Sequence, residues 1–252
     1  MRVWDVHPGY LDRGGLLGQH VEIHAIRSVL AGAGGYTHHP EVLRWADRFA
    51  ALEIAHEVTA QEMRLRGFRH RSPLAAVPEP GSPGYPPSLI PPTDQLDRIR
   101  KKLRGRAAVG RIPVPDRGTA FWAQHKYSVM ARGYRRYREL SSSMSGYGDP
   151  HITDSGELVG AVLCALRRPV LPGAMGNTLD HIWGHLKEEA DPTERADYEA
   201  ARDRGATGRA LVELFEMAEK QEERYLLHST VFAPGPLPAA TAGTDATPGE
   251  VE

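Results

Sequence analysis

The chain has 252 residues, of which 40% are hydrophobic and 25% are charged, and its formal net charge is −1 at pH 7. These proportions are typical of a soluble globular protein with one large domain or two small ones. The single cysteine excludes an internal disulfide framework, and no apolar stretch has the length of a membrane span or a signal-peptide core, so we expect a cytoplasmic protein.

The small net charge conceals an asymmetry between the two halves of the chain. Residues 1–110 carry 15 Lys and Arg against 11 Asp and Glu, a net charge of +4, whereas the remainder has a net charge of −5. The same 110 residues also hold seven of the twelve histidines. A binding surface for a polyanion is therefore expected in the first half.

The first half is predicted to form three helices. Apolar residues at helical spacing predict a helix over residues 16–30, which the glycines after it end. Pro40 opens a second helix over residues 41–65, and Gly67 ends it. Residues 72–92 are rich in Pro and Gly and are expected to form a loop. A third helix begins at residues 93–97 and carries a run of basic side chains, namely Arg98, Arg100, Lys101, Lys102, Arg104 and Arg106.

The second half follows a proline-rich linker at residues 112–118. Helices are predicted over residues 120–140, 157–166, 175–190, 192–204 and 207–228, and strand signals are scarce. From Phe232 onward the chain is rich in Pro, Ala, Thr and Gly, a composition that predicts disorder. We therefore expect an all-α protein with two helical domains, residues 1–110 and 118–231, and a disordered tail, residues 232–252.

The first residues suggest a nucleophile. Because Arg2 is not a small residue, Met1 is expected to be retained. An α-amine has a pKa of about 7.7–8.0, against about 10.4 for lysine, so it is the amine most readily unprotonated at neutral pH. An unprotonated amine can attack a sugar C1′ and form a Schiff base. The alternative interpretation is a chain terminus without a chemical role.

Four segments in the first half form a recognisable series. They are Arg2-Val3-Trp4-Asp5-Val6-His7-Pro8, Leu16-Leu17-Gly18-Gln19-His20-Val21-Glu22-Ile23-His24, Gly35-Tyr36-Thr37-His38-His39-Pro40-Glu41 and Glu62-Met63-Arg64-Leu65-Arg66-Gly67-Phe68. Over residues 1–106 this series resembles the pyrimidine-dimer DNA glycosylase family of the phage endonuclease V type. The resemblance implies a helical fold and a DNA repair glycosylase with associated abasic-site lyase activity.

The resemblance also implies roles for individual residues. Met1 matches the terminal amine that acts as the nucleophile, Arg2 the arginine that follows it, and Glu22 the catalytic glutamate. The interval of 21 positions from Met1 to Glu22 equals the family's interval between amine and glutamate. Val21 and Ala25 stand where the phage enzyme has arginines. His20, His24 and Arg27 lie nearby and are expected to replace those arginines in part as DNA contacts.

The expected partner is double-stranded damaged DNA, without a membrane, a protein partner or a cofactor. Arg98, Lys101, Lys102 and Arg104 on the predicted basic helix are candidate phosphate contacts, although a solvated basic helix has the same composition. His20 and His24 are spaced i, i+4, which also suits a metal ion, but the sequence shows no third ligand. No metal is therefore expected.

The second half carries a different motif. His125-Lys126-Tyr127 and the later segment Asn177-Thr178-Leu179-Asp180-His181-Ile182-Trp183-Gly184-His185-Leu186-Lys187 resemble the YbgA-like helical domain of unknown function. Asn177, His181 and Lys187 share a helix face, and with His125 and Lys126 they form a candidate polar site for an anion or a nucleic-acid phosphate. The alternative is a buried, hydrogen-bonded core. His181 and His185 lack the glutamate of the His-Glu-x-x-His pattern, which argues against a zinc hydrolase.

The sequence leaves three functions to compare. The first is a DNA glycosylase with abasic-site lyase activity that acts through Met1 and Glu22. The second is a non-catalytic nucleic-acid-binding protein. The third is an enzyme that acts on modified nucleobases or nucleosides.

Overall fold

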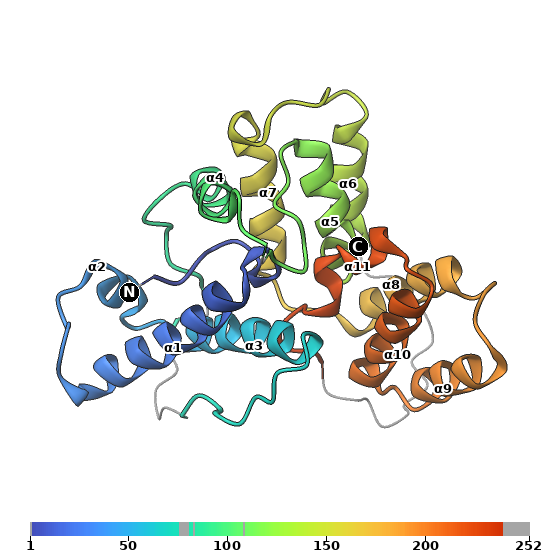
Figure 1. The fold of residues 1–252 in the computed structure, drawn as a ribbon, viewed down its shortest axis with the longest axis horizontal. Coiled ribbons are helices and arrows are strands. Elements are labelled where there is room, and N and C mark those ends of the chain that lie inside the picture. Colours follow the sequence, from blue (N-terminus) through green and yellow to red (C-terminus); the bar gives the residue numbers. More distant parts are fainter. Residues whose placement is uncertain (1, 76–80, 83, 108, 239–252) are drawn as a thin grey trace.

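The computed structural model describes residues 2–75, 81–82, 84–107 and 109–238 (Figure 1). Within these ranges the chain forms α-helices, three 3₁₀ turns and no β-strand, which confirms the all-α prediction. The helices in chain order are α1 (Arg13–Ser28), α2 (Pro40–Trp45), α3 (Phe49–Leu65), α4 (Pro92–Leu103), α5 (Gly118–Met130), α6 (Tyr134–Met144), α7 (Gly156–Leu166), α8 (Pro172–Leu186), α9 (Pro192–Asp203), α10 (Thr207–Lys220) and α11 (Arg224–Leu227).

The first helices follow the local signals with one exception. The side chain of Asp12 caps α1 by accepting a hydrogen bond from the backbone of Gly15, and Pro40 opens α2 as predicted. The prediction of a single helix over residues 41–65 is wrong, because a turn interrupts the helix between α2 and α3. Asp47 adopts a left-handed φ of 56° at this break, and its carbonyl accepts a hydrogen bond from the backbone of Ser82. A distant loop therefore stabilises a turn that has no glycine or proline.

Two long helices predicted in the second half are also divided. Residues 120–140 form α5 and α6, which Gly133 separates with a φ of 156°. Residues 207–228 form α10 and α11, and Glu222 lies at the break with a φ of 54°. A glycine signals the first break, whereas the second occurs at a residue type that rarely adopts a left-handed conformation.

Among the described residues, the buried hydrophobic side chains form three clusters between the helices drawn in Figure 1. One lies around α1, α2 and the start of α3, and contains Ile23 and Trp45. A second lies among α8, α9 and α10 in the second half. The remaining cluster draws on both predicted domains, since it joins Tyr10 and Leu96 to Phe121 and other residues of α5 and α7. The two halves therefore share buried apolar surface.

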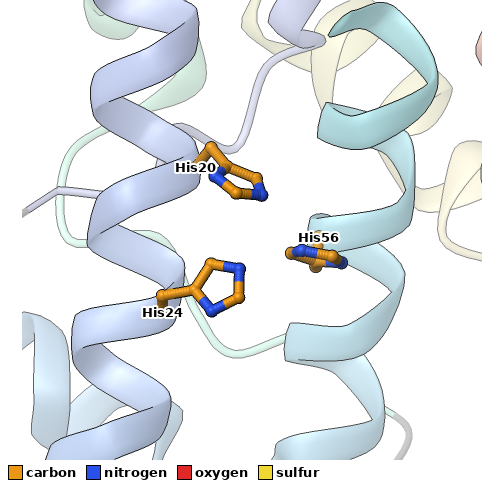
Figure 2. Close-up of side chains that lie close together, drawn as sticks. All are labelled: His20, His24 and His56. Carbon is orange, nitrogen blue, oxygen red and sulfur yellow. The ribbon is translucent and has the colours of Figure 1, made fainter. Parts of the chain in front are cut away.

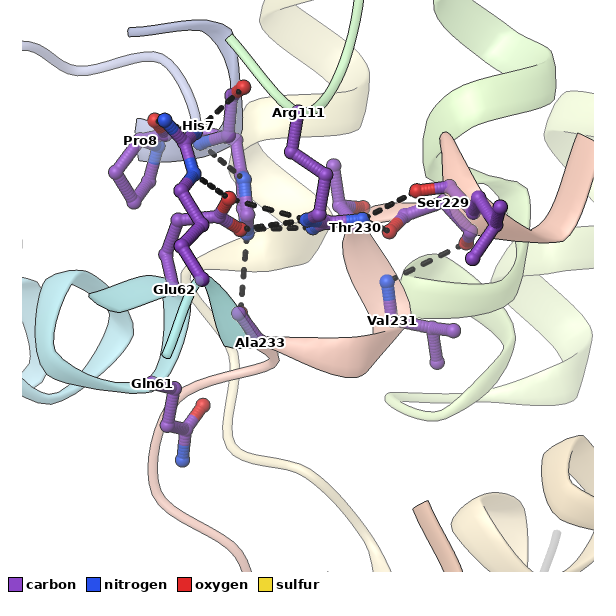
Figure 3. A network of polar contacts seen from close by, with 12 residues as sticks. His7, Pro8, Gln61, Glu62, Arg111, Ser229, Thr230, Val231 and Ala233 are labelled. Atoms are coloured by element: carbon purple, nitrogen blue, oxygen red, sulfur yellow. Dashed lines mark hydrogen bonds and ion pairs between the residues drawn. The ribbon is translucent and has the colours of Figure 1, made fainter. Parts of the chain in front are cut away.

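A buried polar network also connects the two halves (Figure 3). Glu62 on α3 is fully buried and pairs with Arg66 at 2.8 Å and with Arg111 at 2.7 Å. Arg111 also donates hydrogen bonds to the carbonyl oxygens of Leu227 and, at 3.2 Å, Ser229. Burial alone would raise the pKa of Glu62, but the charge and hydrogen bonds of Arg111, together with His7 and Arg66, outweigh burial and lower it. Glu62 is thus an ionised acceptor at neutral pH.

His7 belongs to the same network and predicts a loss of stability in acid. Its Nδ1 accepts a hydrogen bond from Gly9, so the neutral ring carries its proton on Nε2, which donates to the carbonyl oxygen of Ala233. Burial and the charge of Arg111 lower the pKa of His7 to about 4, although Glu62 acts in the opposite direction. Because the unfolded chain binds this proton first, the free energy of unfolding should fall by about 3 kcal/mol as pH decreases from 6.5 to 4.

Urea unfolding at a series of pH values measures this dependence. A His7→Gln variant should lose this part of the acid dependence, whereas a variant of the exposed His38, His38→Gln, should retain it. If the free energy of unfolding of the wild type and of the His7→Gln variant falls equally with decreasing pH, His7 is not the source of this acid dependence.

Part of the segment predicted to be disordered, residues 232–238, packs against the rest of the protein. Phe232, Ala233 and Pro234 are buried, and Arg132 donates a hydrogen bond to the carbonyl oxygen of Pro234 at 2.5 Å. Gly235 exchanges two hydrogen bonds with the side chain of Gln61 on α3. Tertiary partners thus order a segment that could not fold by itself, which corrects the predicted boundary at Phe232. Residues 239–252 lie outside the described residues.

Tyr10 makes a further link between the halves and gives a second stability prediction. Its buried hydroxyl donates to Oε1 of Gln124 at 2.7 Å and lies 2.9 Å from Nε2 of His125. A Tyr10→Phe variant leaves these buried groups without their partner and should lose about 1–3 kcal/mol of unfolding free energy. Tyr36→Phe, at a residue that is 73% exposed, should change little. Denaturant titration of both variants makes the comparison, and equal stabilities would contradict it.

Candidate active site at the start of the chain

The extended segment that precedes the first 3₁₀ turn, Pro8–Tyr10, is fixed by backbone hydrogen bonds. The backbone N–H of Trp4 donates to Oε1 of Gln19 on α1 at 3.0 Å. The backbone N–H of Asp5 donates to Oε1 of Gln95 on α4 at 2.8 Å, and Nε2 of Gln95 donates to Asp5 Oδ2 at 2.7 Å. Two amide side chains from different helices therefore set the position of this segment.

Buried charges reinforce the same segment. The side chain of Asp5 is 1% exposed and forms ion pairs with Arg44 of α2 and, at 3.5 Å, with Arg167 at the end of α7. Arg44 also pairs with Glu41 at 2.8 Å and donates to the carbonyl oxygen of Val3 at 3.4 Å. Because breaking a buried ion pair leaves an uncompensated charge, this arrangement restrains the segment from both halves of the protein.

Of the predicted catalytic residues, Met1 lies outside the described residues and Glu22 is half-buried on α1. Val3 is buried in the same core cluster as Ile23 and Ile26 of α1. Val3 therefore packs against α1, the helix that carries Glu22. Arg2 is exposed, and its guanidinium lies 4.9 Å from the centre of the Trp4 ring. Arg2 also lines an open surface pocket beside α2.

The three residues expected to replace the family's arginines occupy different environments. His20 and His24 are half-buried, their ring centres lie 4.6 Å apart, and His20 Nε2 lies 3.0 Å from Nε2 of His70. Arg27 is only 8% exposed. Its Nε donates to the carbonyl oxygen of Ala75 at 3.1 Å, and its guanidinium stacks on Phe49. Arg27 therefore has a structural contact, and the histidines face a cluster of other histidines.

Helix α4 presents its basic side chains to solvent. Leu96 and Ile99 are buried, while the four predicted phosphate contacts on the other faces, Arg98, Lys101, Lys102 and Arg104, are exposed. Lys101 pairs with Asp97 at 2.7 Å, and Lys102 lies 3.6 Å from Asp12, the residue that caps α1. The helix is amphipathic with a cationic outer face next to the beginning of α1, which suits contact with a phosphate backbone.

The predicted polar site of the second half is not assembled as a unit. His125 is fully buried and contacts Tyr10 and Thr230 in the core, and burial keeps its pKa well below the usual value. In contrast, Asn177 and His181 lie exposed on α8, and Lys187 lies exposed directly after its end. Helical spacing alone identified the shared face of α8, but it did not reveal that His125 points into the core.

Lys126, the remaining member of the predicted polar site, lies against two tyrosine rings, and the sequence did not predict this contact. Its ammonium lies 4.7 Å from the ring centre of Tyr127 and 4.9 Å from that of Tyr225. The Tyr127 hydroxyl lies 2.8 Å from Nε2 of His185 on α8. Burial would lower the pKa of Lys126, but a hydrogen bond with Tyr225 and the neighbouring tyrosines raise it. Tyr225 is about a hundred residues distant in sequence, so no local pattern links it to Lys126.

The comparison with protein families agrees with both resemblances inferred from the motifs. Residues 1–76 match the family model described as pyrimidine dimer DNA glycosylase. Residues 126–236 match a family described as a protein of unknown function, DUF1722. No curated protein and no solved structure matches the chain. The first match suggests a DNA glycosylase-like function and a DNA substrate. None of the described helices has the length and apolar character to cross a membrane.

Proposed function

We propose that this protein excises a damaged base from double-stranded DNA and then cleaves the strand at the resulting abasic site. The observation that carries the proposal is the family match over residues 1–76. It is supported by the packing of Val3 and Trp4 against α1, the helix with Glu22: Val3 is buried with Ile23 and Ile26, and the backbone N–H of Trp4 donates to Gln19. A nucleophile carried by a chain terminus needs such restraint, because correct orientation contributes much of the rate of a bimolecular reaction.

The proposed reaction begins with the unprotonated α-amine of Met1. The amine attacks C1′ of the damaged nucleotide, a C–N bond forms, and the glycosidic bond to the base breaks. Glu22 is proposed to stabilise the positive charge that develops on the sugar and to transfer protons. The C1′–O4′ bond then breaks, O4′ takes up a proton, and the nitrogen forms a protonated Schiff base with C1′ of the opened sugar. The Schiff base acidifies the proton on C2′; loss of this proton expels the 3′ phosphate by β-elimination and nicks the strand. Water then hydrolyses the imine and regenerates the amine.

Binding is proposed to involve Arg2 and the outer face of α4. The lesion is reached by flipping the nucleotide out of the helix, which costs a few kcal/mol and is easiest where the base is damaged. The exposed basic residues of α4 would hold phosphates on one side of the lesion, and Arg2 would hold a phosphate beside the flipped nucleotide by charge-assisted hydrogen bonds. His20, His24 and Arg27, with the inward contacts described above, are assigned no direct DNA contact in this proposal.

Strand cleavage on defined duplexes tests the function. Intact mass first establishes that the mature chain begins at Met1. The protein is then incubated with a duplex that contains one cyclobutane thymine dimer, a duplex with one abasic site, and an undamaged control. Nicking of both damaged duplexes with β-elimination ends is expected. If only the abasic duplex is nicked, the base that the enzyme excises is a lesion other than the thymine dimer. If neither duplex is nicked, the enzymatic proposal is contradicted and a non-catalytic DNA-binding protein is favoured.

A further inference from the structure

Four histidines from separate parts of the first half converge between α1 and α3. His20 and His24 lie one turn apart on α1, His56 faces them from α3 (Figure 2), and His70 follows the end of α3. The ring centres of His20, His24 and His56 are 4.6–5.1 Å apart, and that of His70 lies 5.0 Å from His20 and 5.1 Å from His56. The chain folds these rings around a common centre.

Hydrogen bonding within the protein does not satisfy this cluster. His20 and His70 approach through their Nε2 atoms at 3.0 Å. The Nε2 atoms of His24 and His56 are buried and have no hydrogen-bond partner among the described residues. A buried polar atom without a partner costs about 1–3 kcal/mol, so two such atoms on neighbouring rings, whose centres lie 5.0 Å apart, indicate a missing ligand.

The protonation state of the cluster suits a cation that binds through nitrogen. Burial, with the neighbouring histidines, lowers the pKa of His20 and of His56 to about 4, and burial also lowers the pKa of His24. The rings of His20, His24 and His56 are therefore neutral at pH 7, the form that coordinates a metal ion. The rings of His24 and His56 each form a hydrogen bond with the backbone of Ser72. Such outer contacts orient the rings of metal-binding histidines.

We propose that His20, His24, His56 and His70 bind one divalent transition-metal ion, with Zn²⁺ the best fit, as a structural site between α1 and α3. An all-imidazole set suits zinc and its neighbours, whereas calcium and magnesium require oxygen ligands. The candidate nitrogen atoms of His20, His24 and His56 all lie within 4.8 Å of one another. Tetrahedral zinc with bonds of about 2.0–2.1 Å places its ligands about 3.3 Å apart, so ring movements of roughly 1.5 Å or less bring these three nitrogens to zinc. His70, whose Nε2 lies 3.0 Å from Nε2 of His20, is the fourth proposed ligand.

The surroundings of the site fit this role. His56 and His70 line a surface pocket together with Glu53 and Glu57, which gives the ion a route from solvent and supplies negative charge near the opening. Four protein ligands leave no open coordination position, which is typical of structural rather than catalytic zinc. The ion links α1 to α3 and to the chain after α3, and thereby fixes the helix that carries Glu22. The proposal is independent of the glycosylase activity.

The test uses the full chain without a histidine tag. The protein is stripped with a chelator, dialysed, and titrated with Zn²⁺ and with Co²⁺ while the metal content and Tm are measured. We expect about one ion per chain, a rise in Tm of about 5–10 °C with Zn²⁺, and the intense visible absorption of four-coordinate Co²⁺. A folded protein that retains no stoichiometric ion and whose Tm does not respond to Zn²⁺ would overturn the proposal.

Variants identify the ligands. His56→Gln should weaken Zn²⁺ binding by more than ~100-fold, because loss of an outer contact alone already costs about 10–100-fold. The matched control is the double variant His181→Gln/His185→Gln, which removes an exposed i, i+4 pair on α8 and should keep the full stoichiometry. If His56→Gln does not fold, the Co²⁺ spectrum of the wild type still tests the site, because it distinguishes four-coordinate nitrogen ligation from a weak surface site. A spectrum of a weak surface site would overturn the proposal. These readouts do not depend on DNA cleavage.

Discussion

Glu62→Gln is expected to lower the free energy of unfolding by about 3–5 kcal/mol, the largest effect of any single substitution considered for the fold. The carboxylate is the common acceptor for Arg66 and Arg111, and its side chain is completely buried. The amide keeps the volume but removes the negative charge, so Arg111, whose side chain is 10% exposed, is left without its counter-charge. Arg111 also holds the backbone at Leu227 and Ser229, and the loss should therefore extend to the second half.

Denaturant unfolding followed by helical circular dichroism measures this effect. The matched control is Glu57→Gln on the same helix, since Glu57 pairs with Arg64 where the side chains are 35% and 48% exposed. Exposed pairs contribute about 0–1 kcal/mol, so the control should remain near the wild type. If Glu62→Gln is as stable as Glu57→Gln, the network in Figure 3 does not hold the two halves together.

Glu22→Gln is expected to reduce the rate of strand cleavage at an abasic site by about 10²–10⁴-fold. The proposed role of Glu22 is to transfer protons and stabilise the cationic sugar, and the neutral amide does neither. Affinity for the damaged duplex should change only a few-fold, because the proposed phosphate contacts are on α4 and at Arg2. Single-turnover cleavage and binding measured at the same salt concentration separate the two effects.

Glu53→Gln provides the control for Glu22. Glu53 is an exposed glutamate on α3, the helix packed beside α1, and its loss removes the same charge from the same half. Its cleavage rate should equal that of the wild type. A Glu22→Gln variant that cleaves as fast as Glu53→Gln would remove Glu22 from the mechanism.

Local patterns predicted much of the fold. Apolar spacing located α1, the helix-start residues 93–97 located α4, and Pro40 marked the beginning of α2. The helical regions of the second half were also located, although two of them were predicted as single longer helices. The breaks at Asp47 and Glu222 were missed because both residues adopt a left-handed conformation that their residue types rarely adopt; at Asp47 a hydrogen bond from the distant Ser82 stabilises the turn. The ordered segment after Phe232 was missed for a related reason, since its stability comes from Arg132 and Gln61 rather than from its own composition.

The candidate sites show a similar limit. The motif around Glu22 and the spacing of His20 and His24 are local and were visible in the sequence. His56 and His70 were not recognised as partners of that pair, because only the packing of α1 on α3 brings them together. The excess of histidine in the first 110 residues was the one available signal. Arg27 shows the opposite case, since its proximity in sequence to Glu22 suggested a DNA contact while its side chain is buried.

The central claim is that the α-amine of Met1 forms a Schiff base with DNA, and reductive trapping tests it most directly. Protein that begins at Met1 is mixed with an abasic-site duplex in the presence of borohydride, and the adduct is digested and mapped by mass spectrometry. The account predicts a covalent adduct on Met1 that disappears when extra residues are added before Met1, because an amide nitrogen is not nucleophilic. An adduct that maps to a lysine, or no adduct from folded protein with a free terminal amine, would contradict it.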